Sequence, residues 1–228
     1  MKEETIVISL GGSLIIPDNL DIDFLVSFKK LILSQVEQGK KFAIITGGGK
    51  LCRRYNEAAS KISKLSSDEL DWLGIYSTRF NAEFIRLILG DEYCEKEIII
   101  NPTLPINFNK SIVIGAGWEP GNSTDLDAIL VAKLVGAKRV INMSNIDHVY
   151  DSDPKKNPQA KWFDKISWSD YRKLIPSVWK PGLNSPFDPV ASKTAEEAGI
   201  EVVIMNGKPI ENLEECLNGE AFQGTVIS

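Results

Sequence analysis

The chain has 228 residues, of which 43% are hydrophobic and 25% charged, so it is long and apolar enough to form an α/β core. Its net charge of −5 argues against a nucleic-acid partner, and any anion must be bound by a local group of amides and cations. The three cysteines have neither metal-ligand nor redox spacing, which fits a cytoplasmic protein. We expect no signal peptide, because the start is acidic, and no membrane span, because apolar runs are short.

Short apolar runs alternate along the chain with longer segments of helical periodicity. The runs predict strands at residues 5–10, 41–46, 97–100, 111–115, 138–143, 200–205 and 225–227. The periodic segments predict helices at residues 21–38, 50–63, 68–89, 124–136, 187–198 and 210–217. Near-continuous apolar strands separated by helices indicate a mostly parallel sheet covered on both faces, with ligands at the carboxyl ends of the strands.

Three glycine-rich loops follow predicted strands: "SLGGSLIIP" (9–17), "TGGGKLCRR" (46–54) and "GAGWEPGNSTD" (115–125). None is a Walker A sequence or a dinucleotide-binding fingerprint. Successive glycine amides at a helix N-terminus can bind phosphate oxygens, whereas the simpler interpretation is a set of tight turns. Three such loops at one sheet edge favour phosphate binding. Two facing phosphate sites suggest a phosphoryl donor and a phosphorylated acceptor.

A polar stretch of 19 residues (145–163) follows the strand predicted at 138–143, and an ordered loop of that length is commonly a functional or lid segment. We find no internal repeat or long linker and expect a single domain over 1–228. The nearest feature to a boundary lies near residue 137, after the third glycine loop and its helix.

Six segments in this order resemble the archaeal-type uridylate kinases of the amino-acid-kinase superfamily: "ISLGGSLIIPDNLDIDFL", "GGGKLCRRY", "DWLGIYSTRFNA", "EPGNSTDLDAILVAK", "NIDHVYDSDPKKNP" and "FDPVASKTAEEAGI". The resemblance spans nearly the whole chain. It implies a three-layer αβα sandwich with a mainly parallel central sheet, with an acceptor-binding lobe at about 1–137 and a nucleotide-donor lobe at about 138–228.

The resemblance also implies site residues. The donor ATP would be bound by Gly11, Gly12, Ser13, Asp147, Tyr150, Asp153 and Pro154. The acceptor UMP would be bound by Gly47, Gly48, Gly49, Arg53, Asp71 and Thr124. Asp125 and Asp188 would organise the groups around the transferring phosphate. We assign no protein ligand to a metal, because Mg²⁺ is expected to bind mainly through nucleotide phosphates and water.

Several of these residues also have purely structural interpretations. Thr124 and Asp127 have the spacing of a helix capping box, and Asp125 could merely complement the helix dipole. Asp71 could be a solvated surface acid, and the single histidine, His148, could be an ordinary loop residue.

The sequence departs from the superfamily pattern at three positions. Ser9 stands where many superfamily kinases have a lysine that neutralises the transferring phosphoryl group. His148 and Ala116 stand where relatives have glycine, and His148 leaves the donor preference open.

The leading hypothesis is ATP-dependent phosphorylation of UMP to UDP, by in-line attack and with Mg²⁺. One alternative is an isopentenyl-phosphate or acetylglutamate type of kinase, although "GGGKLCRRYNEAA" lacks the acceptor-site histidine of the former. A binding protein for molybdate or tungstate storage, or a nucleotide sensor, is another. By family analogy we expect a homo-oligomer, a hexamer, with the apolar-striped helix at about 68–89 as a dimer face.

Overall fold

The computed structural model describes residues 4–176 and 185–228, and its centre is a seven-stranded sheet. Its strands, in spatial order, are β3 (Ile112–Gly115), β2 (Lys41–Thr46), β1 (Thr5–Leu10), β4 (Arg139–Ser144), β8 (Glu201–Asn206), β9 (Thr225–Ile227) and β7 (Lys165–Ile166). The first five are parallel, and β9 pairs antiparallel with β8. The predicted mainly parallel sheet is confirmed.

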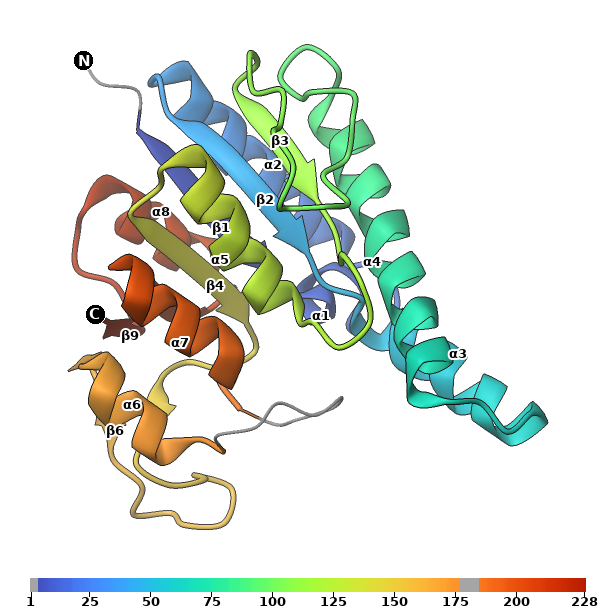
Figure 1. Cartoon of the computed structure of the whole chain (residues 1–228). Helices are drawn as coiled ribbons and strands as arrows, with labels where there is room; N and C mark the ends of the chain where they lie inside the picture. Colours follow the sequence, from blue (N-terminus) through green and yellow to red (C-terminus); the bar gives the residue numbers. More distant parts are fainter. Residues whose placement is uncertain (1–3, 177–184) are drawn as a thin grey trace.

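Helices cover both faces of this sheet and give the predicted three layers (Figure 1). One face carries α2 (Ile22–Glu37), α4 (Ser67–Leu89) and α8 (Ile210–Asn218). The other carries α5 (Thr124–Val135) and α7 (Pro189–Ala198), next to the short α6 (Trp168–Leu174). No helix of the described ranges has the length and apolar character needed to cross a membrane.

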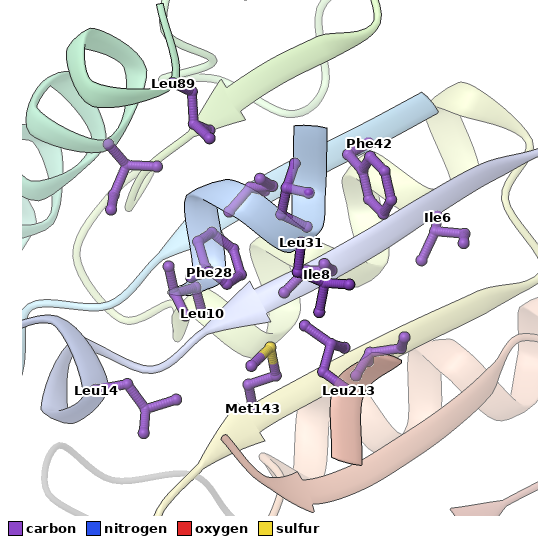
Figure 2. Packing of buried hydrophobic residues seen from close by; sticks show 14 of the residues in the cluster. Ile6, Ile8, Leu10, Leu14, Phe28, Leu31, Phe42, Leu89, Met143 and Leu213 are labelled. Atoms are coloured by element: carbon purple, nitrogen blue, oxygen red, sulfur yellow. The ribbon is translucent and has the colours of Figure 1, made fainter. Parts of the chain in front are cut away.

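The alternation of β1 explains how one strand serves both layers. Ile6, Ile8 and Leu10 point into the core under α2 and α8, where Phe28 of α2 packs among them (Figure 2). Val7 belongs to the core under α5. Because side chains alternate along a strand, Ser9 lies on the α5 face of the sheet.

Most predicted elements are confirmed to within two residues, but the strand predicted at 97–100 is wrong. The segment pairs with β3 only through isolated bridges, Cys94 to Ile112 and Ile99 to Gly115. Polar residues lie between the two bridges, so the apolar run at 97–100 is too short to continue the ladder.

The sequence interpretation also missed short elements. These are α1 (Gly12–Ile15), α6, β7 and the two-stranded ribbon of β5 (Val149–Tyr150) and β6 (Trp162–Phe163). The ribbon lies inside the polar stretch 145–163, which is therefore only partly a loop. Elements of two to seven residues are too short to show a clear period.

The capping box predicted at Thr124 and Asp127 is wrong. Ser123 is the N-cap of α5, and its Oγ accepts a hydrogen bond from Leu126 N at 3.2 Å. A complete capping box is present instead at the start of α4, between Ser66 and Glu69. Thr124 and Asp127 are thus left without the structural role that their spacing suggested.

Candidate functional site at the carboxyl ends of β1 and β4

The candidate site lies where the sheet changes direction. Strand β1 connects through α2 to β2 on one side, whereas β4 pairs with the other side of β1 and connects onward to β8. In open α/β sheets the crevice at such a switch point binds the ligand. Ser9 of β1 and Asn142 of β4 are register partners next to this crevice.

The first two glycine loops touch at this edge. A Cβ on Gly12 would lie 2.1 Å from Gly49 N, and a Cβ on Gly47 would lie 2.7 Å from Gly12 N. Gly49 has a φ of +65°, which side chains rarely adopt. The close approach and the positive φ therefore require glycine at these positions, and the two predicted phosphate loops form one continuous backbone surface.

Each loop leads directly into a helix. Gly11 precedes α1, and Gly48 precedes α3 (Gly49–Ile62), and neither residue supplies a side-chain cap. First-turn amides without a side-chain cap are available to anionic oxygens. Ser13 lies within α1, so the structure brings Gly11, Gly12 and Ser13 next to Gly47, Gly48 and Gly49.

Asn81 of α4 forms a hydrogen bond with the backbone of the second glycine loop. It is 1% exposed, and its Nδ2 donates to Gly47 O at 2.8 Å, which fixes the orientation of that carbonyl. The sequence interpretation did not select Asn81, although it lies within "DWLGIYSTRFNA". An asparagine in the middle of a long helix was the available signal, because this residue favours caps and turns.

Asp125 is the centre of a polar network beneath the crevice. Its Oδ1 accepts from Asn142 Nδ2 at 2.8 Å and from Ser9 Oγ at 3.4 Å, and its Oδ2 accepts from the Asp188 amide at 3.2 Å. Burial, followed by the nearby Asp188 carboxylate, raises the pKa of Asp125 to about 7. The sequence interpretation missed Asn142, because one polar residue in a buried strand carries no pattern.

Asp188 has two roles in this network. It is the N-cap of α7, where its Oδ1 accepts from Ala191 N at 2.7 Å, and its amide holds Asp125. Its Oδ2 is buried and has no hydrogen-bond partner among the described residues. Burial raises the pKa of Asp188. Asp125 and Asp188 therefore form a coupled acidic pair at the switch point.

The basic residues of α3 are not equivalent. Arg53 is exposed and forms no ion pair within the described ranges, whereas Arg54 lies 3.8 Å from Asp18. Lys50 also pairs with Asp18. Arg53 is therefore the cation of this first part of α3 that has no carboxylate partner in the described structure.

Asp71 and Thr124 both lie next to the C-terminal part of the third glycine loop. Asp71 of α4 accepts a hydrogen bond from Gly121 N at 3.0 Å, so it is tied to that loop and is not a free surface acid. Thr124 is the first residue of α5 and is half-buried.

The other predicted donor residues, Asp147, Tyr150, Asp153 and Pro154, follow β4 in the chain. Asp147 accepts from Asn206 Nδ2 at 2.6 Å, which ties the ends of β4 and β8 together. Tyr150 lies in β5, and its ring is 6.4 Å from that of His148. Asp153 and Pro154 are exposed in the turn that follows, where Asp153 Oδ1 accepts from Lys155 N. Asp153 and Pro154 form no contact with the glycine loops that the structure records.

Residues 4–176 and 185–228 contain no group of three or more His, Cys, Asp or Glu able to hold a metal ion. Mg²⁺ commonly binds through substrate phosphates and retains several waters. The unpartnered Oδ2 of Asp188 fits this mode, because a buried carboxylate oxygen can accept a hydrogen bond from a metal-bound water.

Comparisons with known proteins agree with this geometry. The model of the amino acid kinase family matches residues 4–206. A uridylate kinase of Thermoplasma acidophilum is 34% identical over 237 residues, which cover 98% of this chain and 96% of the relative. A uridylate kinase of Methanocaldococcus jannaschii is 35% identical over 232 residues, with 97% and 98% covered.

Solved structures show the same architecture. The crystal structure of the uridylate kinase from Archaeoglobus fulgidus superposes with a TM-score of 0.80 at 30% identity and covers 98% of this chain and 99% of that one. The UMP kinase from Ureaplasma parvum superposes with a TM-score of 0.78 over the full length of both chains. Its identity of 18% makes it evidence of fold alone.

Proposed function

The chain belongs to the amino acid kinase family, and we propose on that premise that it transfers the γ-phosphoryl group of ATP to UMP, giving ADP and UDP. The observation that carries the proposal is Asp125, which lies at the switch point beside two glycine loops in direct contact. The uridylate kinases that resemble the chain over nearly its whole length support UMP as the acceptor.

On the donor side, the amides of Gly12 and Ser13 would hold the ATP phosphates, with the nucleoside toward Asp147 and Tyr150. Gly11 would shape the same loop, because its own amide already donates to Met143 O at 2.8 Å. Asp153 and Pro154 would close the outer end of that pocket. We assign the nucleotide-donor lobe to about 138–228. Both lobes share one sheet, because β1 and β4 are paired neighbours.

On the acceptor side, the loop of Gly47, Gly48 and Gly49 would bind the UMP phosphate through the amides of Gly48 and Gly49, because Gly47 N already donates to Leu10 O at 2.9 Å. Arg53 would reach back over this loop from α3. Asp71 and Thr124 would contact the nucleoside next to the C-terminal part of the third loop. We assign this acceptor lobe to about 1–137. Contact between the loops would bring the two phosphates into line.

Phosphoryl transfer needs alignment and charge neutralisation rather than a protein nucleophile. Mg²⁺ bound to phosphate oxygens would neutralise part of the charge. Asp125, oriented by Ser9 and Asn142, would organise the donors around the transferring group, and Asp188 would orient Asp125 through its amide.

A coupled ADP-release assay with UMP, CMP, isopentenyl phosphate and acetylglutamate tests the proposal. We expect turnover with UMP at least tenfold above that with the other acceptors. Turnover only with isopentenyl phosphate or acetylglutamate would identify a different small-molecule kinase. Nucleotide binding without turnover would favour a storage or sensor protein, a reading motivated by the absence of a lysine at Ser9.

We also propose a cytoplasmic homo-oligomer. Trp72, Tyr76, Phe80 and Leu87 on α4 are exposed large side chains, with Tyr76 60% and Phe80 67% exposed. Their spacings of four, four and seven residues place them along one stripe of the helix, which fits a helix-to-helix contact. Light scattering that showed a stable monomer at micromolar concentration would contradict this.

A further inference from the structure

Asp127 is a buried acid that the proposed chemistry leaves unexplained. It lies on α5 two residues after Asp125 and is 1% exposed. Its Oδ1 is buried without a hydrogen-bond partner in the described part of the chain. An unsatisfied buried oxygen costs stability, so its retention calls for a compensating role.

The other oxygen of Asp127 shows what that role is. Asp127 Oδ2 accepts a hydrogen bond from Trp118 N at 3.3 Å, and Arg79 Nη2 of α4 donates to Trp118 O at 3.0 Å. The third glycine loop is thus fixed at Trp118 from two sides. Asp127 binds the backbone N–H of Trp118, and Arg79 binds its backbone C=O. Arg79 also bonds Gly117 O at 3.4 Å.

Arg79 is itself held in place. Its guanidinium lies 5.7 Å from the ring centres of Trp72 and Tyr76, where cation–π attraction restrains it. The preceding residue of α4, Thr78, also contacts the loop, because its Oγ1 accepts from Gly117 N at 2.8 Å. The loop therefore has a fixed support on α4, and Asp127 is the contact that links it to the helix carrying Asp125.

We propose that Asp127 is a positioning residue for the acceptor, which sets the third loop relative to Asp125 by holding the Trp118 amide. This inference rests on the proposed function, because it assigns the third loop, which Asp71 contacts and Thr124 follows, to the acceptor nucleoside. Asp127 is too buried to touch a ligand, so it acts through the loop. A chain that keeps an unsatisfied carboxylate for this purpose sacrifices stability for placement of the substrate.

The test compares Asp127→Leu with Asp127→Asn in the full-length protein. Leucine removes the acceptor for Trp118 N, and we expect the KM for UMP to rise about tenfold, with kcat and the KM for ATP within about threefold of wild type. Asparagine keeps an acceptor oxygen, so we expect the KM for UMP within about threefold. An unchanged KM for UMP in Asp127→Leu would overturn the inference.

A stability measurement separates placement from a merely structural role. Burial, followed by repulsion from Asp125 and Glu119, raises the pKa of Asp127 to about 7 despite the Trp118 amide and Arg79. Between the unfolded value of 3.8 and about 7 the folded state binds the extra proton, so Asp127 costs stability increasingly as the pH rises. Asp127→Asn should therefore raise Tm more at pH 8 than at pH 5. A lower Tm at pH 8 would mean that the acid is structural.

A double-mutant cycle with Arg79→Leu completes the test. If both side chains hold the same loop, the effect of the double variant on the KM for UMP is smaller than the product of the single effects. Independent multiplication of the two effects would contradict a shared target. If the wild type itself neither binds nor phosphorylates UMP, the proposed function fails, and the Tm comparison still reports on Asp127.

Discussion

The two glycine loops meet at Gly12, yet they belong to parts of the molecule that are packed very differently. The first loop follows β1, which is buried from Ile6 onward and is flanked by β2 and β4. The second leads into α3, which contains no buried residue and extends with the start of α4 away from the sheet (Figure 1). Ile62 at its end is 83% exposed.

This difference in packing suggests that the two sides of the proposed site differ in rigidity. In the proposed assignment, the first glycine loop and Asp125 belong to the donor and catalytic side, and both are carried by elements packed in the core. The proposed acceptor side includes α3, which has no buried residue, and regions with few buried contacts open and shift at low energetic cost. We call the first loop, Asp125 and the core elements that carry them the rigid half, and the second loop with α3 the adaptable half. The two halves are in direct contact where the loops touch.

Gly12→Ala should disrupt the contact between the two loops and have the largest effect of the variants proposed. The new Cβ would lie 2.1 Å from Gly49 N and 2.5 Å from Gly47 O, so backbone must move in both loops. We expect loss of detectable ATP and UMP binding by calorimetry. The control is Gly39→Ala, because Gly39 has a φ of +91° but open space around it. That variant should lose some stability and keep both affinities. Normal UMP binding by Gly12→Ala would show that the loops act independently.

Asp125→Asn tests the rigid half. An organiser of the transferring group acts mainly in the transition state, so we expect kcat to fall by about 100-fold or more, with the KM for UMP nearly unchanged. Asp127→Asn is the matched control on the same helix, since both carboxyls have a pKa raised to about 7. Equal losses in binding and turnover for Asp125→Asn would argue against this role.

Arg53→Ala tests the adaptable half. A charge-assisted contact to phosphate contributes roughly 1.5–3 kcal/mol, so UMP binding should weaken by about 10- to 150-fold. Arg54→Ala is the control and should cost little, because Arg54 faces Asp18. ATP affinity should hardly change in either variant. Loss of ATP binding with normal UMP binding in Arg53→Ala would mean that the two loops have been assigned the wrong way round.

The same contrast explains how far the sequence alone could lead. Long apolar strands and periodic helices predicted the sheet and its layers, because each run carries its own pattern. The glycine loops predicted an anion site, since only glycine permits such close backbone approach. Asn142 and Asn81 could not be found this way, because each acts through a partner distant in sequence. The pinning of Trp118 likewise depends on three elements meeting in space.

Ser9→Lys has the smallest expected effect and asks whether the rigid half lacks a charge. Ser9 is 5% exposed, and its Oγ donates to Asp125 Oδ1 at 3.4 Å, so a lysine there would place an ammonium group next to an acid whose pKa is about 7. The ammonium group of the lysine and the Asp125 carboxylate would form an ion pair, so little positive charge would remain to stabilise the transferring phosphoryl group. We therefore expect kcat to change by less than about tenfold, or ~1.4 kcal/mol. Ser9→Met, similar in length but uncharged, controls for the volume of the new side chain, and steady-state kinetics on the two variants isolate the charge. If Ser9→Lys gained several hundredfold in kcat and Ser9→Met did not, the native site would be short of a catalytic cation, and the chain would have drifted from catalysis toward nucleotide binding.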